Sequence, residues 1–319
     1  MTTQIHRRDF LAASAAAGAG LLAASHLQAA PFKTTLKKAL IGAPQEATLK
    51  SWKEAGFDGI ESGVWKITEA DAAAARKVAD KLGMTIHAVM YGWANFNDDS
   101  KREGDIADVE TALRACAGYG ADALLVVPCR VGGMPMPQPW EFDIEFDDKT
   151  GHVKRVVASD NAPYQQYIEA QNHATDISRK AIQQLIPVAE KTKVVIALEN
   201  VWNNLWVKPA FFTHFIDSFQ CPWVQCYFDI GNHVKYAMPE EWIRSLGKLI
   251  VKCHVKDFKL NEDGHGGKFV DIRDGSVDWP LVRAELDKIG YNGWMTIEGS
   301  GGLSLEERNR RLDLIVAGK

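Results

Sequence analysis

From residue 36 onward, short apolar segments alternate with segments whose apolar residues recur every three or four positions. The first kind is typical of buried β-strands and the second of amphipathic helices. Eight strands are predicted, at residues 36–43, 57–63, 85–90, 123–128, 194–200, 225–230, 249–255 and 294–298. Eight helices are predicted to follow them, at residues 46–55, 68–82, 104–119, 163–191, 209–219, 239–246, 277–289 and 305–317.

Strands that are each followed by a helix predict an α/β fold, a single-domain (β/α)8 TIM barrel. The alternative is an open doubly wound sheet, but no glycine-rich phosphate-binding turn follows the first strand. The regular pattern is interrupted at about residues 130–161, where alternating residues surround an Asp-Lys-Thr-Gly sequence. We interpret this segment as a hairpin-like insertion after the fourth strand, where long loops are commonly functional.

The alternation within each strand indicates which face enters the barrel, because successive strand residues point to opposite sides. In the last strand, Trp294, Thr296 and Glu298 share one face. In the third strand, His87 is expected on the inner face and Ala88 on the outer face. The apolar faces must meet the helices, so the faces that carry polar residues are predicted to point inward.

The first thirty residues have the pattern of an export signal. The pair Arg7-Arg8 precedes a weakly hydrophobic stretch of Ala, Gly and Leu, and the small residues Ala29-Ala30 follow it. Paired arginines are typical of the twin-arginine type. A membrane anchor or an ordinary helix is the alternative, but the stretch is short for a bilayer span. We expect residues 1–30 to be a signal peptide and residues 31–319 to be a periplasmic or secreted barrel, which meets the membrane only during export.

Composition narrows the possible functions. Hydrophobic residues make up 46% of the chain, as in ordinary globular proteins, and the formal net charge is −4. No long basic run or stripe is present, which argues against binding to nucleic acid. The five cysteines are an odd number without a CxxC pair, so we expect buried free thiols, although export would permit a disulfide.

Four predicted strands end on side chains that commonly bind metals. These residues are Glu199, Asp229, His254 and Glu298. Active sites of this fold lie at the C-terminal ends of the strands, so the four side chains are expected to converge. Each alone has an ordinary explanation as a surface, turn or core residue. Together, three carboxylates and one imidazole predict a site for one divalent ion such as Mn²⁺, Mg²⁺, Co²⁺ or Zn²⁺.

The motifs around these residues resemble those of the sugar phosphate isomerase/epimerase family. They are Leu-Glu-Asn at 198–200, Phe-Asp-Ile-Gly-Asn-His-Val at 228–234, His-Val-Lys-Asp at 254–257 and the stretch 275–298. That family shares the xylose isomerase-like TIM barrel and includes ketose 3-epimerases, hydroxypyruvate isomerase and inosose dehydratase. Several ketose epimerases have a histidine three positions after the metal-binding aspartate. This chain has Asn232 at that position, and His233 follows it.

The resemblance implies a single divalent ion bound by the four residues named above. It also implies that Glu199 and Glu298 act as acid and base on opposite faces of a bound sugar. One glutamate would remove a proton, the ion would stabilise the resulting enediolate, and the other glutamate would return the proton.

Aromatic and polar side chains near the strand ends are expected to contact the substrate, because aromatic rings stack well on the C–H faces of sugars. The predicted contacts are Glu61, His87, Trp93, Trp202, Asn232, His233 and Lys256. Sugar phosphates are scarce outside the cytoplasm, and no glycine-rich or arginine-clustered phosphate cradle is evident. We therefore expect an unphosphorylated sugar, keto-sugar or polyol derivative.

These expectations favour a divalent-metal-dependent sugar isomerase or epimerase. Two alternatives stay open: a lyase that eliminates a glycosidic oxygen from an oxidised (keto) glycoside, and a non-catalytic carbohydrate-binding barrel with a structural ion. An endonuclease of the same superfamily would need several clustered metals and a basic surface, which the sequence does not indicate. The expected partner is a small carbohydrate rather than nucleic acid, and assembly into a homo-oligomer is left open.

Overall fold

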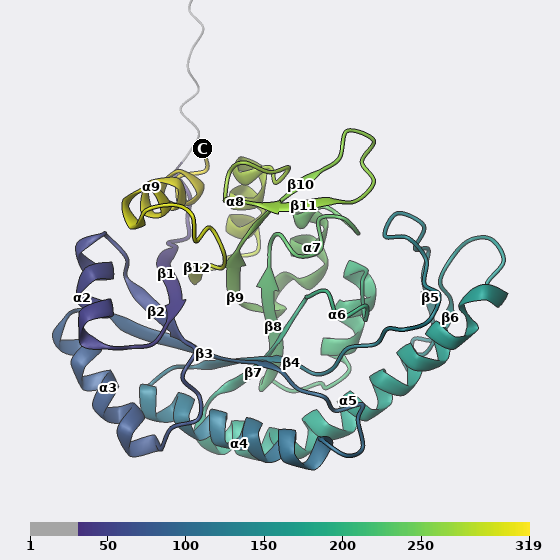
Figure 1. Cartoon of the computed structure of the whole chain (residues 1–319), viewed down its shortest axis with the longest axis horizontal. Coiled ribbons are helices and arrows are strands. Elements are labelled where there is room, and N and C mark those ends of the chain that lie inside the picture. Colours follow the sequence, from purple (N-terminus) through teal and green to yellow (C-terminus); the bar gives the residue numbers. More distant parts are fainter. Residues whose placement is uncertain (1–30) are drawn as a thin grey trace, which may run out of the picture. The chain divides into compact units, whose positions relative to one another are not determined.

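The computed structural model describes residues 31–319, and Figure 1 shows how their helices and strands are arranged. Eight parallel strands form a closed barrel in the order β1-β12-β9-β8-β7-β4-β3-β2, which confirms the predicted (β/α)8 barrel. The ring closes where the first strand pairs with the last, Lys37 lying opposite Trp294. The predicted signal peptide lies outside the described residues.

All eight predicted strands and all eight predicted helices are present, with ends displaced by only a few residues. The barrel strands are β1 (Lys37–Gly42), β2 (Gly59–Ser62), β3 (Thr85–Trp93), β4 (Ala123–Val127), β7 (Val195–Glu199), β8 (Val224–Asp229), β9 (Ile250–Val255) and β12 (Trp294–Ile297). The helices are α2 (Glu46–Glu54), α3 (Glu69–Lys81), α4 (Arg102–Tyr119), α5 (Gln165–Thr192), α6 (Pro209–Asp217), α7 (Pro239–Leu246), α8 (Trp279–Lys288) and α9 (Leu305–Val316). Two short 3-10 helices, Ala162–Tyr164 and Gly247–Leu249, precede α5 and β9.

The apolar residues divide into two clusters, one on each side of the barrel wall. The larger cluster packs the strands against the helices and includes Leu49 of α2, Leu113 of α4 and Leu185 of α5. The smaller cluster fills the inside of the barrel with Ala88, Ala123, Leu125, Val127, Ala197 and Tyr227. The barrel is therefore a packed core, as is usual for this fold.

The third strand differs from the predicted alternation at its centre. Its pairing with β2 shifts between Ile60 and Glu61, so that Glu61 lies opposite Ala88. A β-bulge adds one residue to a strand and breaks the strict alternation of faces. Ala88 consequently belongs to the inner cluster, although the sequence placed it on the outer face. His87 is buried beside it, and its ring stacks on Trp294.

Two hairpins extend the barrel after β4 and β9. The predicted insertion contains the antiparallel pair β5 (Glu145–Phe146) and β6 (Val153–Arg155), which confirms the expected hairpin. A second hairpin, β10 (Asp257–Leu260) and β11 (Gly267–Val270), was not predicted. The rings of Trp140 and His265 stack with centroids 4.2 Å apart, so the two insertions touch.

A buried carboxylate fixes the base of the second hairpin. Asp257 is fully buried and accepts hydrogen bonds from the backbone N–H groups of Phe258, Arg273, Gly275 and Val277 and from the indole N–H of Trp279. The neighbouring ammonium group of Lys256 contacts Asp229 and Glu298 rather than Asp257. Asp257 therefore holds the chain that returns from the hairpin to α8.

Two further observations bear on the class of protein. Within residues 31–319, every helix is too short or too polar to cross a bilayer. All five cysteines are free thiols, four of them buried, as the sequence predicted.

Candidate metal centre

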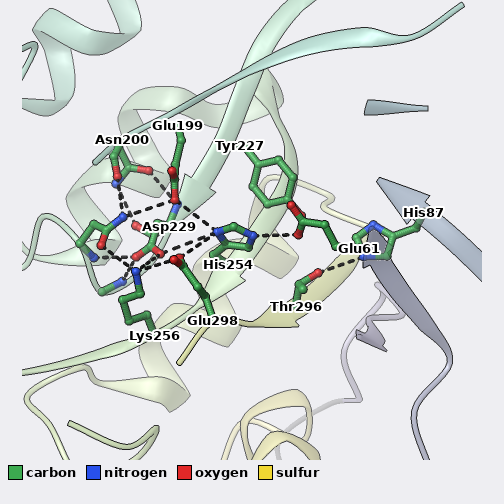
Figure 2. Close-up of polar contacts among 12 residues, drawn as sticks. Glu61, His87, Glu199, Asn200, Tyr227, Asp229, His254, Lys256, Thr296 and Glu298 are labelled. Carbon is green, nitrogen blue, oxygen red and sulfur yellow. Dashed lines mark hydrogen bonds and ion pairs between the residues drawn. The ribbon is translucent and has the colours of Figure 1, made fainter. Parts of the chain in front are cut away.

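The four predicted ligands lie together where four neighbouring strands end (Figure 2). Glu199, Asp229 and His254 lie on β7, β8 and β9, and Glu298 directly follows β12. One ligand atom from each residue lies within 4.8 Å of the others. The Nδ1 atom of His254 is 3.1 Å from Glu298 Oε2, 3.2 Å from Glu199 Oε1 and 4.0 Å from Asp229 Oδ2.

The imidazole of His254 is oriented from behind by a further carboxylate. Its Nε2 atom is 2.8 Å from Oε2 of Glu61, and the phenol of Tyr227 donates to the same oxygen at 2.5 Å. All three side chains are buried. A metal-bound histidine usually donates its other ring N–H to a carboxylate, which fixes its tautomer. With an ion bound, the proton would belong on Nε2, and the lone pair of Nδ1 would face the ion among the three carboxylates.

Asp229 is held so that a single oxygen faces the cluster. Its Oδ1 atom accepts hydrogen bonds from the backbone N–H groups of Gly231 at 2.8 Å and Asn232 at 2.6 Å. The amide side chain of Asn200 bonds to both the backbone N–H and the backbone carbonyl of Asp229. The remaining Oδ2 atom is buried and accepts no hydrogen bond. Such an atom calls for a cation, so the residues present fit a divalent ion.

Lys256 supplies positive charge beside the cluster. Its ammonium nitrogen is 2.8 Å from Oε2 of Glu298 and 3.5 Å from Oδ2 of Asp229. It also donates a hydrogen bond to Oδ1 of Asn232 at 3.1 Å. Lys256, which the sequence predicted as a substrate contact, therefore lies within ion-pair distance of two candidate ligands.

The pKa values of the four groups are those of a site that needs a cation. Burial raises the pKa of Glu199 and of Asp229, because it disfavours the charged carboxylate. Burial also opposes ionisation of Glu298, but contact with His254 lowers the pKa of that carboxyl. Burial would lower the pKa of His254, yet Glu61 and the neighbouring glutamates raise it well above its usual value. The surrounding carboxylates therefore favour the protonated imidazole when no cation is bound, so a proton and a cation compete for this position.

Two other predicted contacts lie at the edge of this cluster. Asn232 donates to Oε1 of Glu199 at 3.4 Å, and its backbone carbonyl accepts a hydrogen bond from the indole N–H of Trp202. The ring of Trp202 lies against Phe269, with centroids 4.7 Å apart. The structure therefore brings Asn232, Trp202 and Lys256 together around the candidate ligands.

Three of the remaining predicted contacts have their partners elsewhere, and Glu61 contacts His254 from behind the cluster. His233 bonds through Nε2 to the carbonyl of Val201 and packs on Trp242. His87 bonds to the hydroxyl of Thr296 inside the barrel. Trp93 is 42% exposed and lies beneath the guanidinium group of Arg130. Glu61 is fully buried behind His254, so its contacts are those of a supporting carboxylate.

Two supporting residues were not predicted as part of the site. Tyr227 shares the inner face of β8 with Asp229, and Asn200 directly follows Glu199. The alternation within β8 was the available evidence for Tyr227. For Asn200 it was the polar residue immediately after an apolar strand. Neither pattern indicates which distant group the side chain binds.

A cavity of about 490 Å³ adjoins the cluster. It is lined by Lys256, Phe269, Val270, Asp271, Glu298, Gly299 and Ser300. Two of these residues contact the candidate ligands or belong to them, so the cavity opens directly onto the metal centre. The β10–β11 hairpin and the loop after β12 form its other walls.

Comparison with known families gives one match that covers most of the chain. A family model described as xylose isomerase-like TIM barrel matches residues 49–312. An uncharacterized protein of Methanocaldococcus jannaschii is 24% identical over 129 residues, which are 39% of this chain and 43% of that protein. The chain thus spans less than half the length of this curated relative.

Several solved structures have the same fold. The 3-keto-D-glucoside 4-epimerase of E. coli is 15% identical over 88% of this chain and 99% of its own, with a TM-score of 0.62. A D-psicose 3-epimerase in the presence of D-fructose is 15% identical over 89% and 100%, with a TM-score of 0.64. The IolI protein with a bound zinc atom is 15% identical over 88% and 96%, also with a TM-score of 0.64. At these identities the likeness shows the fold.

Proposed function

The chain belongs to the xylose isomerase-like TIM barrel family, and from that premise we propose that it is a divalent-metal-dependent isomerase or epimerase. Its substrate is an unphosphorylated sugar, keto-sugar or polyol derivative. The observation that carries the proposal is the convergence of four ligand atoms within 4.8 Å, with Nδ1 of His254 facing three carboxylates.

The ion would be held by Glu199, Asp229, His254 and Glu298. When bound, a divalent cation there supplies positive charge to adjacent carbonyl and hydroxyl oxygens of a sugar. The zinc atom in the IolI structure supports a divalent ion, and the donor set also suits Mn²⁺, Mg²⁺ and Co²⁺.

The two glutamates have different access to a substrate. Glu298 lines the cavity, and its side chain is 32% exposed. It removes the proton from the carbon beside the carbonyl. Glu199 is 7% exposed and lies 3.2 Å from Nδ1 of His254, the atom that Glu298 also contacts, and it returns a proton to the sugar carbon. Lys256, 2.8 Å from Glu298, stabilises the negative charge that develops between these steps.

The kind of sugar is supported by two structural neighbours. Their names describe an epimerase of a keto-glucoside and an epimerase studied with D-fructose, both of them unphosphorylated sugars. Export through a twin-arginine signal, which the pair Arg7-Arg8 favours, would also place the enzyme where sugar phosphates are scarce. Fractionation of cells that express the full chain tests this location, and recovery in the cytoplasm alone would contradict it.

Elimination from a keto-glycoside is the second candidate function. It begins with the same proton abstraction but expels a neighbouring glycosidic oxygen. The cavity of about 490 Å³ beside Glu298 favours this candidate, because it leaves room for the departing group. Release of a free alcohol or sugar without interconversion of isomers would identify it.

The proposal is tested by exchange of substrate C–H with D₂O, after metal analysis of the purified protein. We expect one divalent ion per chain and exchange that stops on chelation. Glu298→Gln should lower the exchange rate by about a hundredfold or more, because the proton acceptor is lost. Glu46→Gln, at an exposed glutamate that begins α2, is the control and should leave the rate unchanged. Exchange that persists without metal would contradict the proposal.

A further inference from the structure

We propose that the cavity beside the metal centre is a second sugar-binding subsite. It takes the ring that is joined by a glycosidic bond to the sugar at the metal. The natural substrate is then a disaccharide-sized glycoside rather than a free monosaccharide. We call the residues that line the cavity the outer subsite; they are Lys256, Phe269, Val270, Asp271, Glu298, Gly299 and Ser300. The inference rests on the proposed function, because it assumes that one sugar ring lies at the metal centre.

The outer subsite is continuous with the catalytic groups. Lys256 and Glu298 form its inner wall, and their charged atoms are 2.8 Å apart. The ammonium nitrogen of Lys256 lies 5.2 Å from the centroid of the Phe269 ring, on the hairpin side of the cavity. A molecule whose reacting carbon lies beside Glu298 can therefore extend along Lys256 to Phe269.

The hairpin presents an aromatic wall that is already fixed in position. Phe269 is 42% exposed, so part of its ring is available to a ligand in the cavity. Its ring is packed against Trp202 and Phe258, with centroid distances of 4.7 and 5.3 Å. Trp202 is held in turn by its bond to the Asn232 carbonyl. A fixed aromatic face can stack on the C–H face of a sugar at little entropic cost.

The polar lining suits hydroxyl groups. No hydrogen bond or ion pair involves the carboxylate of Asp271 within residues 31–319, so it is free to accept from a ligand. The hydroxyl of Ser300 already accepts from the backbone N–H of Ile272 and fixes the loop after β12. An aromatic face with a few placed polar groups is the usual make-up of a carbohydrate pocket.

The space is sufficient for a second ring. Of the four candidate ligands only Glu298 lines the cavity of about 490 Å³, so most of its wall is formed by residues outside the metal cluster. Pockets for small molecules range from roughly 300 to 1,000 Å³. A Cβ atom at Gly299 would meet nothing within 4 Å, so the space beside this residue is open, and its φ of 94° favours glycine.

The test compares two probes, 3-keto-glucose and 3-keto-maltose, the latter oxidised in its non-reducing ring. The readout is kcat/KM for metal-dependent D₂O exchange. We expect the disaccharide to be the better substrate by about tenfold. Phe269→Ala and Phe269→Leu should each remove about that factor for the disaccharide and change the monosaccharide by less than about twofold. Asp271→Asn should also lower only the disaccharide value.

Trp140→Ala is the control for loosening of the hairpin. It removes the stack on His265 at the hairpin tip, which is outside the outer subsite. An equal effect of Trp140→Ala and Phe269→Ala on the disaccharide would overturn the proposal, because hairpin anchoring would then explain both. Equal losses of kcat/KM for the two probes would also overturn it. An aryl 3-keto-glucoside serves as a third probe, with an aromatic group in place of the second sugar ring. The proposal would be overturned if this compound were a better substrate than the disaccharide and Asp271→Asn had no effect.

Failure of the proposed function gives a different result. In that case neither probe exchanges in the unaltered protein, and binding is measured instead by quenching of tryptophan fluorescence. Tighter binding of 3-keto-maltose than of 3-keto-glucose, abolished by Phe269→Ala, would support the outer subsite on its own. Equal binding of the two probes would overturn it.

Discussion

At the scale of single residues, the candidate metal centre depends on side chains that lie behind the four candidate ligands. Glu61 contacts His254 across 193 positions of sequence, and Tyr227 contacts Glu61 across 166. These contacts fix which nitrogen of the imidazole is available as a ligand. Removal of either contact should therefore weaken metal binding before it changes the rate of the catalytic step.

We expect Glu61→Gln to weaken metal binding by about 10- to 100-fold, because the partner that orients His254 is changed. Competition with a coloured chelator measures the dissociation constant. Activity should return when the metal concentration is raised. Glu69→Gln, in the first turn of α3, is the matched control and should bind the ion normally.

A different outcome would assign Glu61 to the substrate, as the sequence predicted. In that case metal affinity would stay unchanged, and KM would rise at saturating metal. The two measurements therefore decide between a supporting carboxylate and a direct substrate contact.

Metal binding should become tighter as the pH rises. The pKa of His254 is raised well above its usual value in the metal-free cluster, and those of Glu199 and Asp229 are raised as well. The ion must displace these protons, and falling pH therefore favours the metal-free form. We expect the dissociation constant to fall about tenfold per pH unit between about pH 6 and about pH 8 for each proton released. A constant that does not change over this range would contradict the assigned protonation of His254.

The four candidate ligands could be predicted because each ends an apolar strand, which places it at a known rim of the barrel. The supporting roles of Glu61 and Tyr227 could not be predicted in the same way. Strand alternation shows that Tyr227 points inward, but not that its phenol reaches a carboxylate on β2. Such pairings depend on the tilt of the strands and on side-chain rotamers.

At the scale of elements, the β10–β11 hairpin connects the candidate site to the body of the barrel. It forms one wall of the cavity and is tied to the body of the barrel by the five hydrogen bonds that Asp257 accepts. Its strands are four residues each, with the sequences Asp-Phe-Lys-Leu and Gly-Lys-Phe-Val. The first alternates polar and apolar residues but follows β9 after a single residue, and the second does not alternate, which is why the sequence did not predict them.

We expect Asp257→Ala to destabilise the protein by roughly 3 to 5 kcal/mol, because it leaves several buried donors without an acceptor. The free energy of unfolding in urea measures this effect. Asp263→Ala, at the exposed tip of the same hairpin, is the control and should change stability by less than about 0.5 kcal/mol. Equal stability of the two variants would show that the hydrogen bonds of Asp257 are dispensable.

The bulge in β3 shows a second limit of prediction at this scale. The strand itself is evident from its apolar residues, but one extra residue reverses the faces that follow it. Nothing in the composition of β3 indicates where the pairing shifts. The order of strands and helices was therefore predictable, while the inner and outer faces of β3 were only partly so.

At the scale of the whole molecule, ligands from four neighbouring strands would link β7, β8, β9 and β12 through one ion. An ion that binds the folded chain alone stabilises it by about 2.7 kcal/mol when its free concentration is 100 times the dissociation constant. For a domain of this size we expect chelation to lower Tm by about 5 °C. Differential scanning calorimetry with and without a chelator measures the shift, and an unchanged Tm would indicate that no ion occupies the cluster.

The pairing of β1 with β12 has a consequence for how the chain is made. Until the ribosome has synthesised β12, β1 has a neighbour on one side only. Partly synthesised chains therefore expose an unpaired strand edge, which can pair with the strands of other nascent chains. A chaperone that shields this edge until translation ends would serve the protein better than one that acts on the released product.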